Sequence, residues 1–157
     1  MIRPAGPGDA AAFAAIAQVS FLDERPWVES EFAALLALPT SYGWISVADS
    51  WPVAFLLCQM IVPDAEILSL AVMPACRRRG HARALLGVCA AYAAQYKITS
   101  IGLECAADNE PAQSLYARAG CEMDGRRRGY YRKGNQASDA IRWKIAPGTL
   151  AKRLLPE

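Results

Sequence analysis

Apolar residues follow two different spacings on either side of a short basic segment near the middle of the chain. Residues 67–72 form a nearly continuous apolar run that Pro74 ends, which is typical of a strand buried on both faces. Over 82–96 the apolar positions instead recur every three or four residues, as on the buried side of a helix. The pattern therefore predicts a strand, a tight turn and a helix, in that order.

The same two spacings predict the other elements of the chain. The expected strands cover 1–3, 42–48, 53–62, 98–106, 121–132 and 139–145, and the expected helices follow Asp9 or cover 29–38 and 111–119. This order predicts an α/β (α+β) fold, with a mixed, mostly antiparallel sheet of about seven strands and helices on both faces. Residues 1–146 are expected to form a single domain, and 147–157, which carry few signals, a loosely held tail.

Composition and charge exclude several classes of protein. A hydrophobic share of 54% is ample for a folded core. The chain has no run of about eighteen apolar residues and no leader segment, so a cytoplasmic protein without membrane contact is expected. The five cysteines are odd in number and widely spaced, which favours reduced thiols. The net charge of +2 is too small to indicate a nucleic-acid partner by itself.

The turn between the central strand and helix reads Arg-Arg-Arg-Gly-His-Ala over residues 77–82. No Ser, Thr, Asp or Asn caps the start of the helix, so its first amides are left free. These amides lie at the positive end of the helix dipole, Gly80 and Ala82 let a ligand approach the backbone, and the arginines add charge. We therefore expect the turn to bind a diphosphate.

Other kinds of site fit the sequence less well. It contains neither a G-x-G-x-x-G dinucleotide motif nor a G-K-[ST] triphosphate loop. The single histidine, His81, lacks partners for a metal site or a triad, so no metal is expected, and it should lie at the loop surface. Cys76 and Cys105 stay open as thiol nucleophiles. A second Arg-Arg-Arg-Gly run at 126–129, followed by two tyrosines, leaves a nucleic-acid contact open, although the modest net charge argues against it.

Several short motifs together resemble one enzyme family. Arg77-x-x-Gly80-x-Ala82 after a strand is similar to the [RQ]-x-x-G-x-[GA] acyl-CoA signature of the GNAT N-acetyltransferase superfamily. Over roughly residues 2–145 the ordered motifs resemble its RimI-type ribosomal-protein alanine N-acetyltransferases. These motifs are Arg25-Pro26-Trp27 with Phe32, Leu103-Glu104-Cys105, the run 108–112, Ser114-Leu115-Tyr116 with Gly120, Arg127-Arg128-Gly129-Tyr130-Tyr131, and Asp139-Ala140.

The resemblance implies acetyl-CoA as the co-substrate. It implies that the diphosphate binds along the signature turn and that the backbone of the preceding strand pairs with the pantetheine arm. Asn109 would hydrogen-bond that arm, cap the following helix, or do both. The implied acetyl-CoA ligands are Leu70, Ala71, Val72, Arg77, Arg78, Arg79, Gly80, His81, Ala82, Arg83 and Asn109.

Acetyl transfer to an amine needs a base and an acid, and the resemblance implies Glu104 and Tyr116 for these roles. Glu104 stands near the end of an apolar strand, where partial burial would strengthen it as a base; a solvated carboxylate is the alternative. The Tyr116 phenol, protonated at neutral pH, would donate a proton to the leaving thiolate; packing against the sheet is the alternative. Trp27, Phe32 and Tyr131 would line the acceptor site, unless the first two only pack in the core.

The expected function follows from this set of roles. It is direct transfer of an acetyl group from acetyl-CoA to the N-terminal α-amino group of a protein, without an acyl-enzyme. A ribosomal protein that begins with alanine is the expected acceptor, and no direct contact with nucleic acid is expected. Two alternatives stay open: a GNAT enzyme that acetylates a small amine, and an acyl-CoA-binding module without activity.

Overall fold

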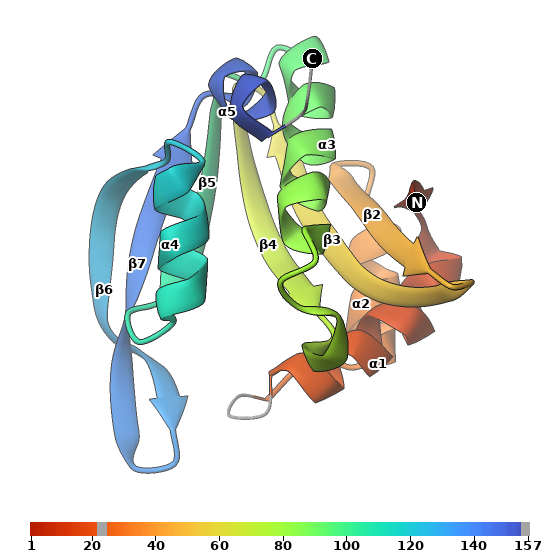
Figure 1. The fold of residues 1–157 in the computed structure, drawn as a ribbon, viewed down its shortest axis with the longest axis horizontal. Helices are drawn as coiled ribbons and strands as arrows, with labels where there is room; N and C mark the ends of the chain where they lie inside the picture. The colour runs from red at the N-terminus through yellow and green to blue at the C-terminus, as the bar shows by residue number, and fades with distance from the viewer. Residues whose placement is uncertain (22–24, 155–157) are drawn as a thin grey trace.

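The computed structural model describes residues 1–21 and 25–154, which contain one seven-stranded sheet and five α-helices (Figure 1). The strands are β1 (Ile2–Ala5), β2 (Ser41–Ala48), β3 (Trp51–Ile61), β4 (Asp64–Val72), β5 (Ser100–Ala106), β6 (Glu122–Lys133) and β7 (Gln136–Ile145). The helices are α1 (Ala10–Ser20), α2 (Glu29–Leu36), α3 (His81–Gln95), α4 (Glu110–Arg118) and α5 (Pro147–Leu154). Short 3₁₀ turns, Pro7–Asp9 and Pro74–Cys76, lie ahead of α1 and α3.

The sheet has the strand order β1-β2-β3-β4-β5-β7-β6. Neighbouring strands are antiparallel except for β4 and β5, which run parallel. Helices α3, α4 and α5 lie on one face, and α1 and α2 lie on the other (Figure 1). This arrangement confirms the predicted fold class.

Each face of the sheet has its own hydrophobic core. Behind the sheet, Phe13 of α1 stacks on Phe55 of β3 with ring centroids 4.2 Å apart, and Phe32 of α2 meets both rings edge-on. In front, Leu85 and Leu86 of α3 are buried against the opposite face. Because β3 and β4 are covered on both sides, their sequences are nearly continuous apolar runs.

Strands β4 and β5 pair over only part of their length. Their register runs from Asp64–Ser100 to Glu66–Gly102, although β4 continues to Val72 and β5 to Ala106. Just past this point the pairing of β4 with β3 shifts by one residue at Leu68, and such a bulge bends a strand. The two strands therefore separate toward their carboxyl ends, as Figure 1 shows.

The prediction of a loosely held tail over 147–157 is wrong for its first part. Pro147–Leu154 form α5, and its Leu150 and Leu154 are 1% and 7% exposed within the core around α3. Two leucines four residues apart anchor one side of this short helix, a pattern too brief to stand out in the sequence. Residues 155–157 lie outside the described part of the chain.

Candidate functional site

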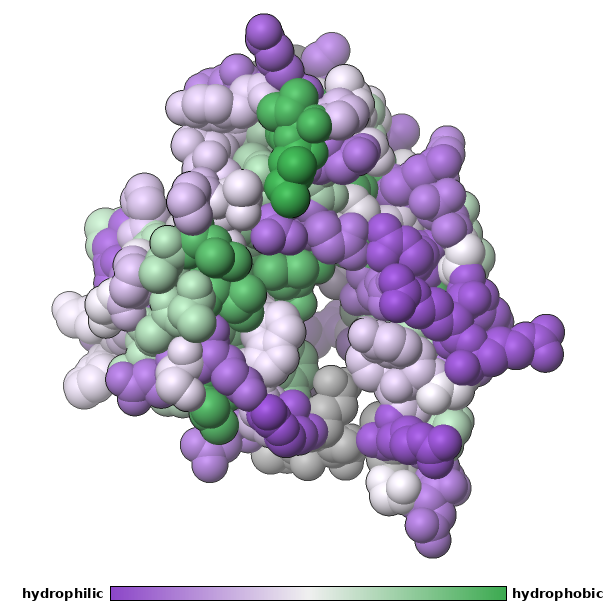
Figure 2. Space-filling model, turned by 180° about the vertical axis from the view of Figure 1, so that it is seen from behind, coloured by the Kyte–Doolittle hydropathy of each residue, from purple (hydrophilic) through white to green (hydrophobic). Residues whose placement is uncertain are grey.

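A cleft of about 980 Å³ opens where β4 and β5 separate. Its walls come from the end of β4, the turn before α3, the first turn of α3, α4 and the end of α5. Seen from behind, the molecule is hollowed near its middle, and strongly hydrophilic side chains gather over β6 and β7 (Figure 2). The cleft brings together ten of the predicted acetyl-CoA ligands, and also Tyr116: they are Leu70, Ala71, Val72, Arg77, Arg78, Gly80, His81, Ala82, Arg83 and Asn109.

The start of α3 faces this cleft without a side-chain cap. Gly80 is the N-cap residue of α3, with φ +84°. Because it has no side chain, it makes no capping hydrogen bond to the first amides of the helix. A Cβ at Gly80 would meet nothing within 4 Å, so the residue is required for its backbone conformation and for the open space beside it. The first amides of a fifteen-residue helix thus border the cleft, as the sequence predicts, and their dipole favours an anion.

The three arginines of the turn lie in different surroundings. The Arg77 side chain donates to the carbonyl oxygens of Val72 and Ser20, at 3.2 and 3.3 Å. It therefore connects the end of β4 to the end of α1, and Arg77 also borders the cleft. Arg79 is exposed and does not line the cleft, whereas Arg77 and Arg78 do.

His81 is not at the loop surface, contrary to the prediction. Its side chain is half-buried, and its Nδ1 lies 2.9 Å from the hydroxyl of Ser46, a residue of β2 that is 2% exposed. A buried hydroxyl needs a partner, and the ring supplies it. The contact ties the first residue of α3 to the sheet, while the same residue borders the cleft.

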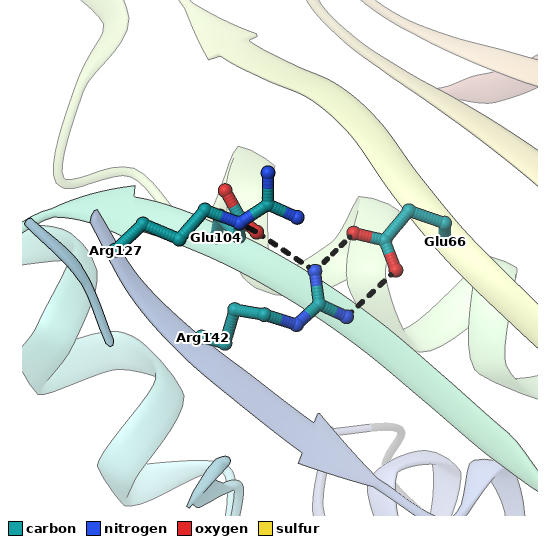
Figure 3. A network of polar contacts seen from close by, with 4 residues as sticks. All are labelled: Glu66, Glu104, Arg127 and Arg142. Carbon is teal, nitrogen blue, oxygen red and sulfur yellow. Dashed lines mark hydrogen bonds and ion pairs between the residues drawn. The ribbon is translucent and has the colours of Figure 1, made fainter. Parts of the chain in front are cut away.

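Glu104 lies on β5 two residues beyond the last β4–β5 pair and belongs to a network of four charged side chains (Figure 3). Its Oε1 is 2.9 Å from Nη1 of Arg142 and 3.1 Å from Nε of Arg127. Arg142 also holds both carboxylate oxygens of Glu66, at 2.9 and 3.1 Å. The Glu104 side chain is 13% exposed, so the two guanidinium groups offset the cost of burying its charge.

This network leaves one oxygen of Glu104 available. Both arginines contact Oε1, and no hydrogen bond from a described residue reaches Oε2. Glu104 therefore presents its Oε2 near the strand separation and is held from one side by Arg142.

Gly102 makes room for this network. It lies two residues before Glu104 on β5, and therefore on the same face of the sheet. A Cβ at Gly102 would lie 2.5 Å from Oε2 of Glu66 and 2.6 Å from Nη2 of Arg142. The ion pair between β4 and β7 thus crosses directly over the bare backbone of β5.

Tyr116 of α4 borders the cleft and is buried, with 6% of its surface exposed. Its ring meets Trp143 of β7 edge-on, with centroids 6.2 Å apart. Burial raises the pKa of the Tyr116 phenol, so the hydroxyl stays protonated at neutral pH. Packing of the ring and a role for the hydroxyl at the cleft are thus compatible, because the ring contacts Trp143 while the residue borders the cleft.

Asn109 caps α4, as one of its two expected roles. Its Oδ1 accepts a hydrogen bond of 3.2 Å from the amide of Ala112. The residue also lines the cleft, so the amide nitrogen of the same side chain stays available for a ligand.

The three aromatic residues expected at the acceptor site lie in different surroundings, and none lines the cleft itself. Phe32 is 1% exposed and sits in the core, so the prediction that it walls the acceptor site is wrong. Trp27 is half-buried and packs edge-on against Phe32, with centroids 5.6 Å apart. Tyr131 of β6 is half-buried beside Tyr130. Trp27 and Tyr131 remain predictions for the acceptor side.

The two candidate thiol nucleophiles are poorly placed for that chemistry. Burial raises the pKa of the Cys105 thiol, which disfavours the reactive thiolate. Cys76 borders the cleft, but the histidine that would have to activate it is bonded to Ser46. All five cysteines are free thiols.

Neither a metal site nor a membrane-spanning helix is found in the described residues. No group of three or more His, Cys, Asp or Glu side chains in residues 1–21 and 25–154 could hold a metal ion. Within the same residues, no helix combines the length and apolar character needed to cross a membrane.

Several residues of the site escaped the sequence prediction. Glu66 and Arg142 form an ion pair across 76 residues of sequence, and no local pattern in either strand marks them as partners. Arg153 also borders the cleft, but it lies in the segment that the sequence marked as a tail.

Comparison with known proteins identifies the kind of molecule to which this site belongs. A model described as the Acetyltransferase (GNAT) family matches residues 11–121. The [Ribosomal protein bS18]-alanine N-acetyltransferase of Haemophilus ducreyi is 33% identical over 79 residues, which are 50% of this chain and 54% of that relative. The match thus spans about half the length of the relative.

Solved structures match over a larger part of the chain. The ribosomal-protein-S18-alanine N-acetyltransferase from Escherichia coli has a TM-score of 0.84 at 26% identity, with 93% of this chain and 94% of that chain covered. NAA60 of Arabidopsis thaliana in complex with acetyl-CoA has a TM-score of 0.80 at 20% identity, with 93% and 97% covered. The likeness to NAA60 shows a shared fold.

Proposed function

Because the chain belongs to the GNAT family of acetyltransferases, as its motifs indicated, we propose that it transfers the acetyl group of acetyl-CoA to the N-terminal α-amino group of a protein. The expected acceptor is a ribosomal protein that begins with alanine. The observation that carries this proposal is the similarity to two enzymes named for ribosomal-protein alanine N-acetylation, one in sequence over part of the chain and one in structure over most of it.

The residues around the cleft fit the parts of acetyl-CoA. The uncapped start of α3 suits the diphosphate, with Gly80 and Ala82 leaving the backbone accessible. Beyond Glu66 the edge of β4 has no strand beside it on the β5 side, so backbone groups of 70–72 can pair with the pantetheine amides. Asn109 can donate to the same arm through its side-chain nitrogen. When bound, acetyl-CoA supplies a thioester whose carbonyl carbon an amine can attack.

Glu104 is the residue proposed to accept the proton of the acceptor amine, directly or through water. An α-amino group has a pKa of roughly 8, so near neutral pH most of it is protonated and cannot attack. The free Oε2 of Glu104 offers an anionic oxygen for the ammonium group. Arg127 is 54% exposed at its side chain, so it can move aside when the acceptor enters, whereas Arg142 keeps Glu104 in place.

Tyr116 is proposed as the proton donor to the departing sulfur. Its pKa is raised by burial, so the phenol carries its proton throughout the neutral range. The ring is fixed by its contact with Trp143, which orients the hydroxyl with little loss of entropy.

An acetylation screen tests the proposed function against its alternatives. The purified protein is incubated with acetyl-CoA and peptides that begin with alanine, with the same peptides blocked at the N-terminus, and with polyamines and aminoglycosides. We expect acetylation of the free peptides only. Activity confined to small amines would instead support the small-amine alternative, and calorimetric binding of acetyl-CoA without acetylation of any acceptor would support the non-catalytic module.

Gly80→Val is expected to weaken acetyl-CoA binding by about tenfold or more. A branched side chain is strained at φ +84° and would occupy the space beside the α3 amides, and each charge-assisted hydrogen bond lost costs about 1.5–3 kcal/mol. The measurement is calorimetric titration with acetyl-CoA. Arg79→Ala is the matched control, because Arg79 belongs to the same turn but does not line the cleft. Unchanged affinity in Gly80→Val would remove the α3 start from the proposed site.

Gly102→Ala is expected to lower kcat/KM by about 10- to 100-fold while acetyl-CoA binds normally. The added methyl group would force apart Glu66 and Arg142, and Arg142 could no longer hold Glu104, whose misplacement by about 1 Å can cost that much. Turnover and acetyl-CoA affinity are measured side by side.

Gly43→Ala controls for the general cost of a methyl group at a strand glycine. Its Cβ would meet the Leu36 side chain at 2.8 Å, in the core behind the sheet and apart from the charged network. We expect this variant to melt at a lower temperature but to keep its kcat/KM. If both variants lose stability and activity in parallel, the network has no special role.

A further inference from the structure

The cleft carries more positive charge than the turn before α3 accounts for. Three further arginines border it, each from a different helix: Arg83 from α3, Arg118 from α4 and Arg153 from α5. Among the described residues, no carboxylate forms an ion pair with any of the three. Three like charges at one opening repel one another, so the arrangement favours an anion with more than one charge.

Two contacts bring these arginines together. Nη2 of Arg83 donates to the carbonyl oxygen of Arg153, at 3.3 Å. The Arg153 guanidinium lies over Gly120, where an added Cβ would be 3.0 Å from its Cζ and Nε. Gly120 follows Arg118 by two residues, so the end of α5 bridges α3 and α4.

Helix α5 holds Arg153 at this place through its apolar side. Leu150 and Leu154 are buried in the core around α3, while Arg153 is exposed at the edge of the cleft. An arginine on a packed helix loses less entropy on binding than one on a loose tail. The position of α5 thus makes Arg153 a fixed part of the cleft wall.

We propose that Arg153, with Arg118 and Arg83, forms a second anion site that binds the 3′-phosphate of the CoA nucleotide. This inference rests on the proposed function, because it takes acetyl-CoA as the ligand. The CoA nucleotide carries a phosphomonoester apart from its diphosphate, and at pH 7 such a group has a charge of about −1.5 to −2. Guanidinium groups bind phosphate oxygens through paired hydrogen bonds, whereas the α3 amides suit the diphosphate. The two sites together would distinguish CoA from nucleotides that lack the 3′-phosphate.

The test compares CoA with 3′-dephospho-CoA by calorimetric titration at neutral pH. The proteins are the wild type, Arg153→Gln, Arg118→Gln and the control Lys152→Gln, which removes the same charge from the same helix at a residue that does not line the cleft. We expect the wild type to bind CoA about tenfold or more tightly than 3′-dephospho-CoA. Arg153→Gln should lose most of this preference, binding CoA about tenfold more weakly and 3′-dephospho-CoA nearly as well as before. Lys152→Gln should keep the preference.

Several results would overturn the inference. If the wild type binds CoA and 3′-dephospho-CoA with equal affinity, the 3′-phosphate has no site. If Arg153→Gln weakens the binding of both ligands equally, Arg153 contacts another part of the nucleotide. If Arg153→Gln is unstable, the preference of Arg118→Gln for CoA over 3′-dephospho-CoA decides the test, because Arg118 lies on another helix. An unchanged preference in Arg118→Gln would then overturn the inference. Failure of the proposed function gives a different result. A wild type that binds neither ligand overturns both the proposed function and the 3′-phosphate site. A wild type that prefers CoA but acetylates no N-terminus overturns the function and leaves the phosphate site supported.

Discussion

We expect Glu104→Gln to lower turnover by about 10²- to 10⁴-fold near neutral pH, the range typical of a lost general base. The amide keeps the shape of the side chain but cannot accept a proton. The fold should survive the change, because Arg142 keeps its two contacts with Glu66. Acetyl-CoA affinity should also stay the same, since Glu104 is not among the residues that line the cleft.

The pH dependence of this variant separates a base from a positioning residue. As the pH rises toward and past about 8, solvent supplies a growing fraction of neutral α-amine, so a protein base becomes less necessary. The ratio of wild-type to Glu104→Gln turnover should therefore shrink with rising pH. The measurement is kcat/KM for an alanine-terminated peptide across pH 6.5 to about 9.

Glu66→Gln provides the matched control for this experiment. It removes one carboxylate from the same network and leaves Arg142 in contact with Glu104, so its pH profile should run parallel to that of the wild type. If the Glu104→Gln profile is also parallel to wild type over the whole range, Glu104 positions the acceptor and does not take its proton.

The parts of the fold that the sequence predicts are those with long, regular spacing. The continuous apolar run of β4 and the three-to-four spacing of α3 were sufficient for these elements, because packing against the sheet requires those patterns. Helix α5 is short and buries Pro147, Leu150 and Leu154, and the separation of β4 from β5 follows a bulge at Leu68. A bulge is a matter of register between two strands, so no single segment reveals it.

The candidate site also has features that follow from local sequence and features that depend on distant residues. The free start of α3 could be predicted because the absence of a capping residue is a local property of 77–82. The support of Glu104 could not, since Arg142 lies 38 residues from Glu104 and 76 from Glu66 in the sequence. Arg77 shows the same limit: its guanidinium donates to two backbone carbonyl oxygens, one of them 57 residues away, and no local pattern reveals these contacts. Long-range partners decide what a charged side chain is free to bind.

Tyr116→Phe is expected to lower kcat by about 10²-fold while the KM for the acceptor changes little, as when an interaction of the transition state is removed. Phenylalanine keeps the ring that packs on Trp143 and deletes only the hydroxyl. A larger loss is not expected. A thiolate has a pKa of roughly 8 to 9, below the pKa of this phenol, so complete transfer of the proton is uphill and the hydroxyl helps mainly while charge develops on sulfur.

The nature of the leaving group provides the decisive comparison for Tyr116. An acyl donor whose thiol has a lower pKa departs without a proton, so it should recover much of the rate that Tyr116→Phe loses with acetyl-CoA. Tyr92→Phe is the matched control, because Tyr92 packs in the same core with Tyr42 and Trp44 but does not line the cleft. It should react like the wild type with both donors. A Tyr116→Phe defect that is equally large with the better leaving group would mean that the phenol does not assist departure of sulfur, and the ring contact with Trp143 would then be the main role of this residue.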